Sequence, residues 1–279
     1  MKPGTLMVVA TPLGNLQDIS PRAVEALRRA RIVACEDTRR TRPLLSHFGI
    51  RPESVVSYHR FNETARCESI LRALREGADV ALVSDGGTPG VSDPGALLVD
   101  AALREGLPVS PIPGPSAVAA AISACGFTAP AFVFAGFLPA RAGARRTALQ
   151  AIARDQRPLV FFEAPHRAAA SLADMAAVLG ERQVTLLRET TKLHEEVRRS
   201  TLAGLAADFA AAAPRGEITL VADGCREPEA PAPRDPESLR CRYAELLDAG
   251  GDPRSALAQI VRETGLRRRE VYAAVRSRS

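Results

Sequence analysis

The segment best suited to ligand binding is SDGGTPGVSDPG at residues 84–95, with four glycines and two prolines in twelve residues. Glycine lacks a Cβ, so its backbone can approach a bound molecule closely and adopt positive φ. Asp85 offers a hydrogen-bond acceptor beside these glycines, and Thr88 offers a hydroxyl donor. A merely long loop is the alternative, but a simple connection needs neither this length nor this composition. We therefore predict a ligand-binding loop.

Two further glycine turns each follow a short apolar run: TPLGNL at residues 11–16 and PGPSA at residues 113–117. Open α/β sheets bind ligands beyond the carboxyl ends of their strands, so the three loops would meet at one crevice. None matches the dinucleotide-binding or P-loop glycine pattern. The second turn lacks a glycine of G-x-S-x-G, and His194 lacks the second histidine of a zinc helix. Neither a serine hydrolase nor a metal site is predicted.

Polar clusters stand at or just beyond other apolar runs: ACEDTRRTR at 34–42, YHRFNE at 58–63 and FFEAPHR at 161–167. At a strand end, charged side chains can face a cleft while the strand itself stays buried. The alternative is structural, because Glu36 and Asp37 can cap the next helix and Arg39 can lie on its surface. His59 and His166 fit a structural hydrogen-bonding role as well as a titrating one.

The elements that position these loops alternate between strands and helices, which is typical of an α/β protein. The first set of expected strands covers residues 6–10, 32–35, 55–58, 80–84 and 109–112. The second set covers residues 132–136, 159–163, 184–188, a strand near Val197, and 218–222, with helices expected at 145–153, 168–179 and 202–212. Ser20, Asn62 and Asp93 are expected to cap helices, and Gly49, Gly77 and Gly106 to end them. Two successive α/β units are therefore predicted.

A change of composition separates a C-terminal tail from these units. Residues 226–237, REPEAPAPRDPE, contain four prolines and no apolar residue larger than alanine, which predicts an extended linker. Helical spacing follows at 239–247, 255–263 and 270–275. Five arginines near the end face a single acid, Glu270, and fit either a solvated surface or a nucleic-acid contact. We predict domains at 1–120 and 121–225, a linker at 226–237 and a basic helical tail at 238–279.

Composition restricts the classes of protein. Apolar residues at 46% and charged residues at 25% are average for a soluble globular protein, and the net charge of +5 permits a polyanionic partner. Lys2 and Lys192 are the only lysines among 37 basic residues, and genome base composition explains this bias most simply. Aromatic residues at 4%, without tryptophan, disfavour an RRM-like domain. Five scattered cysteines, without a secretory leader or membrane span, predict a reduced, cytoplasmic protein.

The loops and clusters together resemble a known family. The matching segments are TPLGNLQDIS, CEDTRRTRPLLSHFGI, HRFNE, SDGGTPGVSDPG, PIPGPSA, GFLP, EAPHR, RETTK, GEITLV and the tail segment REVY. They cover nearly the whole chain and resemble the ribosomal RNA small subunit methyltransferase I family of the tetrapyrrole methylase superfamily. One departure is Gly86, where the family usually has alanine; this should add backbone freedom without removing the pocket.

The resemblance implies two successive α/β/α domains of the class III S-adenosylmethionine (SAM) methyltransferase type, with a small helical tail. It further implies a homodimer that transfers a methyl group from SAM to the 2'-hydroxyl of a cytidine in the decoding region of 16S rRNA. Carried over by motif position, the SAM-binding residues are Pro12, Leu13, Gly14, Asp85, Gly86, Gly87, Thr88, Pro115, Ser116, Phe162 and Glu163.

A general base is expected, because a ribose hydroxyl is a weak acid. The candidates are Glu36, Asp37, His59, Glu63 and Glu163, and the sequence does not choose among them. Arg39 and Arg167 are expected to clamp RNA phosphates, with Arg267, Arg268 and Arg269 of the tail as further contacts.

The expected partner is the small ribosomal subunit, with no DNA and no membrane. Two alternatives stay open: a tetrapyrrole C-methyltransferase with the same donor loops, and a non-catalytic ribosome-assembly factor that retains the fold. The proline-rich linker and the arginine-rich tail argue against the first, because a small macrocycle does not need them.

Overall fold

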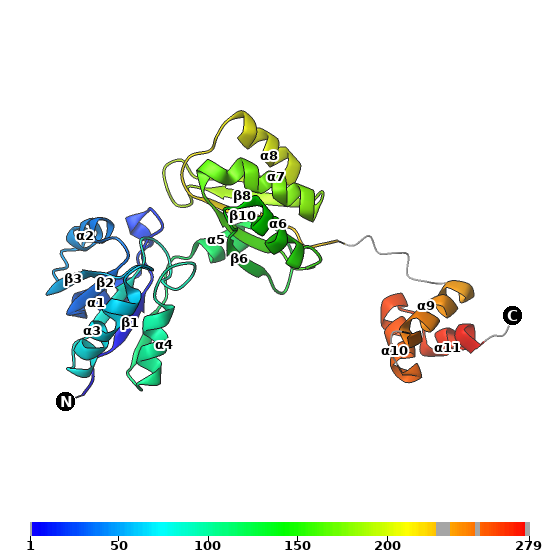
Figure 1. The fold of residues 1–279 in the computed structure, drawn as a ribbon, viewed down its shortest axis with the longest axis horizontal. Helices are drawn as coiled ribbons and strands as arrows, with labels where there is room; N and C mark the ends of the chain where they lie inside the picture. Colours follow the sequence, from blue (N-terminus) through cyan, green and yellow to red (C-terminus); the bar gives the residue numbers. More distant parts are fainter. Residues whose placement is uncertain (1, 227–234, 249–251, 277–279) are drawn as a thin grey trace. The chain divides into compact units, whose positions relative to one another are not determined.

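The structure is a computed structural model that describes residues 2–226, 235–248 and 252–276. The chain divides into two compact units, Met1–Cys225 and Arg226–Ser279. Figure 1 shows the elements of both units. The predicted α/β class with a helical tail is confirmed.

The first sheet of the larger unit is entirely parallel, in the order β3-β2-β4-β1-β5. Its strands are β1 (Leu6–Val9), β2 (Ile32–Cys35), β3 (Ser54–Ser57), β4 (Val80–Val83) and β5 (Val109–Ile112). Leu6 is in register with both Val80 and Val109, so the strands end close together. Both faces are buried, which explains the continuous apolar runs of the central strands.

Two helices cover each face of this sheet. They are α1 (Pro21–Arg29), α2 (Thr38–His47), α3 (Glu63–Arg75) and α4 (Ala96–Arg104). Helices α1 and α2 pack on one face through residues such as Leu27 and Leu45, and α3 and α4 pack on the other through Leu74 and Leu98. This is the expected α/β/α arrangement.

The helix ends agree with the sequence in part. Ser20 caps α1 by accepting a hydrogen bond from the Ala23 N–H, as predicted. The predicted cap at Asp93 is wrong, because α4 begins behind Gly95, whose φ of 137° suits only glycine. Asn62 precedes α3, but its side chain accepts from the His59 N–H and donates to the Ser57 carbonyl instead. A polar residue before a helix thus caps it only when its side chain has no better local partner.

The second sheet has the order β6-β7-β10-β8-β9, and only β6 and β7 are parallel. Its strands are β6 (Val133–Phe137), β7 (Leu159–Glu163), β8 (Gln183–Arg188), β9 (Glu196–Thr201) and β10 (Ile218–Ala222). Because β10 is antiparallel to β7, the start of β10 lies beside the end of β7, with Ile218 opposite Glu163. The antiparallel pairs were not predicted, since an apolar run does not reveal strand direction.

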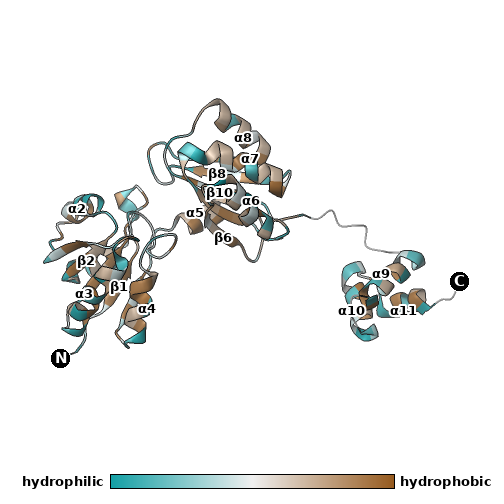
Figure 2. Cartoon of the chain, in the orientation of Figure 1, coloured by the Kyte–Doolittle hydropathy of each residue, from teal (hydrophilic) through white to brown (hydrophobic). Residues whose placement is uncertain are grey.

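Helices cover both faces of the second sheet as well. They are α5 (Ala117–Cys125), α6 (Ala142–Ala151), α7 (Ala168–Leu179) and α8 (Leu202–Ala211), with short 3-10 turns at η1 (Leu16–Asp18) and η2 (Pro165–Arg167). Along β7, Phe161 packs with α7 and α8 on one face, while Val160 packs with α5 on the other. Figure 2 shows hydrophobic residues on the strands of both sheets and mixed residues along the helices.

The boundary predicted after residue 120 falls inside α5. This helix packs on the second sheet through Val118, Ala121 and Cys125. We therefore propose that the two α/β halves meet in the loop after β5, a few residues before the predicted boundary.

The smaller unit consists of α9 (Pro236–Asp248), α10 (Pro253–Thr264) and α11 (Arg268–Arg276). Its core contains Leu239, Leu257, Ile260 and Val271. Helix α9 begins at Pro236, so it includes the last two residues of the predicted linker. Pro236 suits a first helical position, and Asp235 accepts a hydrogen bond from the Ser238 N–H. Residues 227–234 of that linker lie outside the described part of the chain. In the described ranges we find no helix with the length and apolar character to span a bilayer.

Candidate functional site

A cavity of about 500 Å³ lies in the larger unit. It is at the carboxyl ends of strands of the first sheet and, in the second sheet, at the ends of β6 and β7 and the start of β10. The loops and helices that follow strands of the first sheet contribute Leu13, Arg40, Asp85, Gly86, Gly87, Thr88, Val91, Ser92, Asp93, Ser116 and Ala117. The second sheet contributes Phe137, Phe162, Glu163, Ala164, Pro165, Lys192, Gly216, Glu217, Ile218 and Thr219. Small-molecule sites typically have this size and mixture of apolar and polar groups.

The three glycine loops meet at this cavity, as their positions after β1, β4 and β5 predict. Thr11 and Gly87 exchange two backbone hydrogen bonds of 2.9 Å. The Thr88 hydroxyl donates to the Pro115 carbonyl at 3.1 Å, which joins the second loop to the third. The loops therefore support one another before any ligand binds.

The glycines are required mainly by contacts between loops. Gly87 has φ of +90°, and a Cβ there would lie 3.2 Å from Leu13 Cδ2. A Cβ on Gly86 would lie 3.3 Å from the Pro12 carbonyl oxygen, so the alanine usual in the family would fit tightly here. A Cβ on Gly14 would lie 2.4 Å from Lys192 Cγ. Gly14 thus makes room for a side chain from the second sheet.

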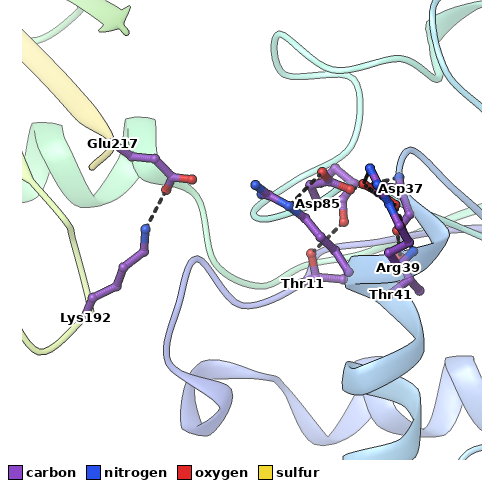
Figure 3. A network of polar contacts seen from close by, with 9 residues as sticks. Thr11, Asp37, Arg39, Thr41, Asp85, Lys192 and Glu217 are labelled. Atoms are coloured by element: carbon purple, nitrogen blue, oxygen red, sulfur yellow. Dashed lines mark hydrogen bonds and ion pairs between the residues drawn. The ribbon is translucent and has the colours of Figure 1, made fainter. Parts of the chain in front are cut away.

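Asp85 lines the cavity and is held by the start of α2. Its Oδ1 accepts the backbone N–H of Asp37 at 3.0 Å, and its Oδ2 lies 3.5 Å from Arg40 Nε. Figure 3 shows this group together with Thr11 and Arg39, and shows Lys192 facing Glu217. The N-terminus of a helix stabilises a carboxylate, so α2 fixes the orientation of Asp85.

Most of the predicted SAM-binding residues line the cavity: Leu13, Asp85, Gly86, Gly87, Thr88, Ser116, Phe162 and Glu163. Of the remaining three, Pro12 lies against Gly86, the Pro115 carbonyl accepts a hydrogen bond from Thr88, and Gly14 lies against Lys192. Their assignment to SAM stays a prediction.

Of the candidate bases, Glu163 alone lines the cavity. Its side chain is almost fully buried, and Oε1 accepts from the Ala164 N–H at 2.7 Å and from Arg167 Nε at 2.5 Å. Arg167 also lies over the Phe137 ring, 6.0 Å from its centroid. Glu163 and Arg167 therefore form a fixed ion pair at the cavity wall.

Asp37 occupies the structural role left open by the sequence. Its side chain caps α2 and pairs with Arg39, and this hydrogen bonding lowers its pKa to about 2. A carboxylate with so low a pKa is a weak base. Glu36, His59 and Glu63 do not line the cavity, although burial and the charge of Asp85 raise the pKa of Glu36.

Four of the five predicted RNA contacts, all except Arg167, lie on surfaces. The Arg39 side chain is 89% exposed despite its pairing with Asp37. Arg267, Arg268 and Arg269 are exposed at the start of α11 in the smaller unit. Arg167 is largely buried and already paired.

Asp93 and Lys192 are among the charged cavity residues that were not predicted as site residues from the sequence. Lys192 Nζ lies 2.9 Å from Glu189 Oε1 and 3.1 Å from Glu217 Oε2. The sequence offers one signal for Lys192, because it is one of two lysines in an arginine-rich chain. Asp93 belongs to the glycine loop, but its position suggested a helix cap.

Residues with an unusual backbone conformation directly precede Asp93 and Lys192. Within the described ranges, the non-glycine residues with positive φ are Ser92, Glu189 and Thr191. Ser92 directly precedes Asp93, and Thr191 directly precedes Lys192. Such conformations cost about 1 to 3 kcal/mol each and cluster at functional sites.

Comparison with known proteins identifies the family. Residues 5–206 match the model of the Tetrapyrrole (Corrin/Porphyrin) Methylases. A Synechocystis protein named Ribosomal RNA small subunit methyltransferase I is 43% identical over 270 residues, 96% of each chain. A Pseudomonas aeruginosa protein of the same name is 44% identical over 276 residues, 98% of this chain and 96% of the relative. This chain belongs to the ribosomal RNA small subunit methyltransferase I family.

A member of this family from Thermotoga maritima is 42% identical over 221 residues, which is 99% of its own length but 79% of this chain. Part of this chain therefore has no counterpart in that relative. Among solved structures, diphthine synthase has a TM-score of 0.61 at 20% identity, covering 79% of this chain and 90% of the other.

A uroporphyrin-III C-methyltransferase from Thermus thermophilus, complexed with S-adenosylhomocysteine, has a TM-score of 0.56 at 20% identity. The match covers 78% of this chain and 97% of the other. Both likenesses show that this chain shares its fold with these two proteins.

Proposed function

We propose that this protein is a SAM-dependent methyltransferase of small-subunit ribosomal RNA, and that its target is the 2'-hydroxyl group of a cytidine in the decoding region of 16S rRNA. The full-length similarity to relatives named ribosomal RNA small subunit methyltransferase I carries the proposal. The cavity at the three glycine loops, where ligands bind in open α/β sheets, supports it.

The residues present suit SAM. Phe137 and Phe162 provide aromatic and apolar surface for an adenine ring, with ring centroids 5.5 Å apart. Asp85, Thr88 and Ser116 provide polar groups for the ribose and the amino-acid portion. Four carboxylates and two cationic side chains line the cavity: Asp85, Asp93, Glu163 and Glu217 against Arg40 and Lys192. This excess of negative charge favours a sulfonium cation.

SAM, when bound, supplies a methyl group that its sulfonium has already activated for transfer. The protein then has to hold the ribose oxygen in line behind that methyl carbon, at about 3 to 3.5 Å, and to exclude water. It also needs a group that accepts the hydroxyl proton. Of the predicted bases, Glu163 is the one at the cavity, and Arg167 holds it in an ion pair.

RNA contacts are assigned to four exposed arginines and to Arg167, which is largely buried. Arg39 stands at the start of α2, two residues beyond the Asp37 backbone that holds Asp85, so it suits a phosphate next to the target nucleotide. Arg167 is assigned to the wall near the target. The tail arginines Arg267, Arg268 and Arg269 would add sequence-independent affinity. We further propose that the protein acts in the cytoplasm as a homodimer.

The test is incubation with methyl-labelled SAM and either small ribosomal subunits or a porphyrinogen. We expect label in 16S rRNA and none in the macrocycle. A 2'-O-methyl group blocks alkaline cleavage of the next phosphodiester bond, so the label should survive alkali in a dinucleotide. Label in a mononucleotide would contradict ribose methylation, label in the macrocycle would favour the tetrapyrrole alternative, and label in neither would favour an assembly factor.

A further inference from the structure

The turn after β3 carries an aromatic residue that has no part in the cavity. Phe61 is 91% exposed, which makes it the most exposed aromatic residue in the described part of the chain. A single exposed apolar residue is common on protein surfaces. Phe61 differs from such residues in how firmly the turn holds it and in the charges that surround it.

Three hydrogen bonds hold the turn that presents Phe61. The His59 N–H donates to Asn62 Oδ1 at 2.8 Å, and Asn62 Nδ2 donates to the Ser57 carbonyl at 3.1 Å. The Phe61 N–H donates to His59 Nδ1 at 3.2 Å, and the two rings meet edge to face with their centroids 6.0 Å apart. Tyr58, where the turn begins, is fully buried. The Phe61 ring is therefore held in place before a partner binds, which lowers the entropic cost of binding.

This turn lies at the same edge of the first sheet as the cavity. The parallel strands β3, β2 and β4 are neighbours, so the segments that follow them leave the sheet side by side. The Tyr58 N–H donates to the Cys35 carbonyl at 2.7 Å, which joins the turn after β3 to the end of β2. Two residues further along, the Asp37 N–H donates to the cavity residue Asp85. RNA whose target nucleotide enters the cavity can therefore lay a neighbouring nucleotide over this edge.

The surface beside Phe61 carries charge that is complementary to RNA. Arg60 is exposed, and its guanidinium lies over the Phe61 ring, 5.9 Å from the centroid. On the segment after β2, the side chains of Arg39 and Arg40 are 89% and 64% exposed, although each pairs with an aspartate. Proteins bind single-stranded nucleic acid with this combination, in which bases stack on aromatic rings and cations lie beside the phosphates. An aromatic ring among arginines therefore fits a nucleotide better than an apolar protein partner.

We propose that Phe61 stacks on an unpaired base next to the target nucleotide, with Arg60 beside the adjoining phosphate. This assignment deepens the proposed function and depends on it. Phe61 contacts neither SAM nor the reacting oxygen, so it is a positioning residue that holds the strand while the target ribose enters the cavity. Every base has a π face, so the stack adds affinity with little preference for sequence.

The first test measures binding of the full-length protein to small ribosomal subunits. Phe61→Ala should weaken binding by about 5- to 150-fold, which is the range for loss of one base stack. It should raise KM more than it lowers kcat, and leave the affinity for SAM, measured by calorimetry, unchanged. Phe61→Trp should retain tight binding, whereas Phe61→Leu, which keeps apolar bulk without a ring, should bind weakly.

The matched control is Phe132→Ala. Phe132 is a 42% exposed ring directly before the start of β6, whereas the cavity contacts Phe137 at the end of that strand. Its loss should leave binding to the subunit unchanged.

Salt dependence separates stacking from charge. A base stack releases no counterions, so Phe61→Ala should lower the binding constant by the same factor at every salt concentration. Arg60→Gln should instead make the slope of the logarithm of the binding constant against the logarithm of the salt concentration shallower by about 0.7. A Phe61 variant that merely disturbed the turn would displace Arg60 and change this slope as well. A shallower slope for Phe61→Ala would therefore contradict the proposal.

A fluorescence measurement reports on the stack directly. The chain contains no tryptophan, so Phe61→Trp supplies a single reporter at this position. A base that stacks on the indole ring quenches its emission. We expect 16S rRNA freed of ribosomal proteins to quench Phe61→Trp and to leave the emission of Phe132→Trp unchanged. Emission of Phe61→Trp that stays level while filter binding shows bound RNA would contradict the stack.

Two further results would overturn the assignment of Phe61 while leaving the proposed function intact. One is an affinity of Phe61→Ala for the subunit within about twofold of the unaltered protein. The other is a dimer that dissociates in Phe61→Ala, measured by sedimentation velocity, which would assign Phe61 to a contact between copies of this chain. If the unaltered protein places no label in RNA, the proposed function fails, and the role of Phe61 fails with it.

Discussion

At the residue scale, Gly14 and Lys192 show how two loops of different sheets create one wall of the cavity. The stem of Lys192 passes over Gly14, and its ammonium group lies between Glu189 and Glu217. Desolvation disfavours the ammonium, but the hydrogen bonds and charges of the two carboxylates outweigh it and raise the pKa of Lys192. The lysine therefore stays charged at neutral pH and neutralises both acids.

This contact leads to a prediction about Gly14→Ala. The added Cβ would displace the Lys192 stem, separate the ammonium from its carboxylates and narrow the cavity. We expect SAM to bind about fivefold more weakly, which corresponds to roughly 1 kcal/mol for a partly exposed ion pair. Calorimetry on the single and double variants measures this effect.

The control for Gly14→Ala is Lys192→Ala. Once the lysine stem is absent, the alanine at position 14 has room, so Gly14→Ala should have no further effect in that background. Simple addition of the two losses would show that Gly14 and Lys192 act independently.

At the scale of elements, α6 and α7 are held together by a carboxylate between two arginines. Asp174 lies 2.5 Å from Arg145 Nη2 and 2.6 Å from Arg146 Nε. The Arg145 and Asp174 side chains are 5% and 6% exposed, and Arg145 also donates to the Ala140 carbonyl. The charge of Arg145 is thus tolerated at the helix interface because Asp174 compensates it.

We therefore expect Asp174→Ala to lower the free energy of unfolding by about 3 to 5 kcal/mol, because the variant leaves a buried guanidinium without its partner. Urea unfolding measures the loss. Asp208→Ala, which removes an exposed pair with Arg198, should cost at most about 1 kcal/mol. Similar losses for the two variants would mean that Asp174 contributes no more than a surface ion pair.

At the scale of the whole molecule, the chain has two units with separate cores, and we propose that they divide the tasks of the reaction. The larger unit contains both sheets and the cavity, while the smaller unit has its own apolar core and an exposed basic helix start. The Thermotoga relative matches only 79% of this chain, a share close to that of the larger unit. The smaller unit is thus expected to add affinity rather than chemistry.

A triple variant tests this division. Replacing Arg267, Arg268 and Arg269 by glutamine should weaken binding to the small ribosomal subunit and leave SAM affinity unchanged. We plot the logarithm of the binding constant for the ribosomal subunit against the logarithm of the salt concentration. The slope of this plot should become shallower by about 0.7 to 0.9 for each phosphate that the altered tail no longer neutralises. Filter binding at several salt concentrations gives this slope.

The matched control for the tail variant removes the same charge elsewhere. Arg22, Arg66 and Arg72 are exposed arginines of α1 and α3. Their replacement by glutamine should alter the salt slope less. Equal slopes for the two triple variants would indicate that net charge, and not the position of the tail arginines, sets the affinity.

Local sequence determined much of the fold. The predicted bounds of β2, β5, β7 and β10 match the structure residue for residue, because these short, mostly apolar runs are bounded by glycine, proline or charged residues. The three glycine loops were also visible, and they meet as expected. Strand direction in the second sheet was not visible, since pairing is a long-range property.

For the site, the sequence by itself determined which glycine loops would meet and that further polar clusters with carboxylates stand at other strand ends. Only the tertiary structure decided what each carboxylate does. Asp37 and Asp93 both looked like helix caps, yet one caps α2 with a pKa near 2 and the other lines the cavity with a pKa near 6. The physical reason is that proton affinity depends on burial and on charges from distant segments, which no local pattern records.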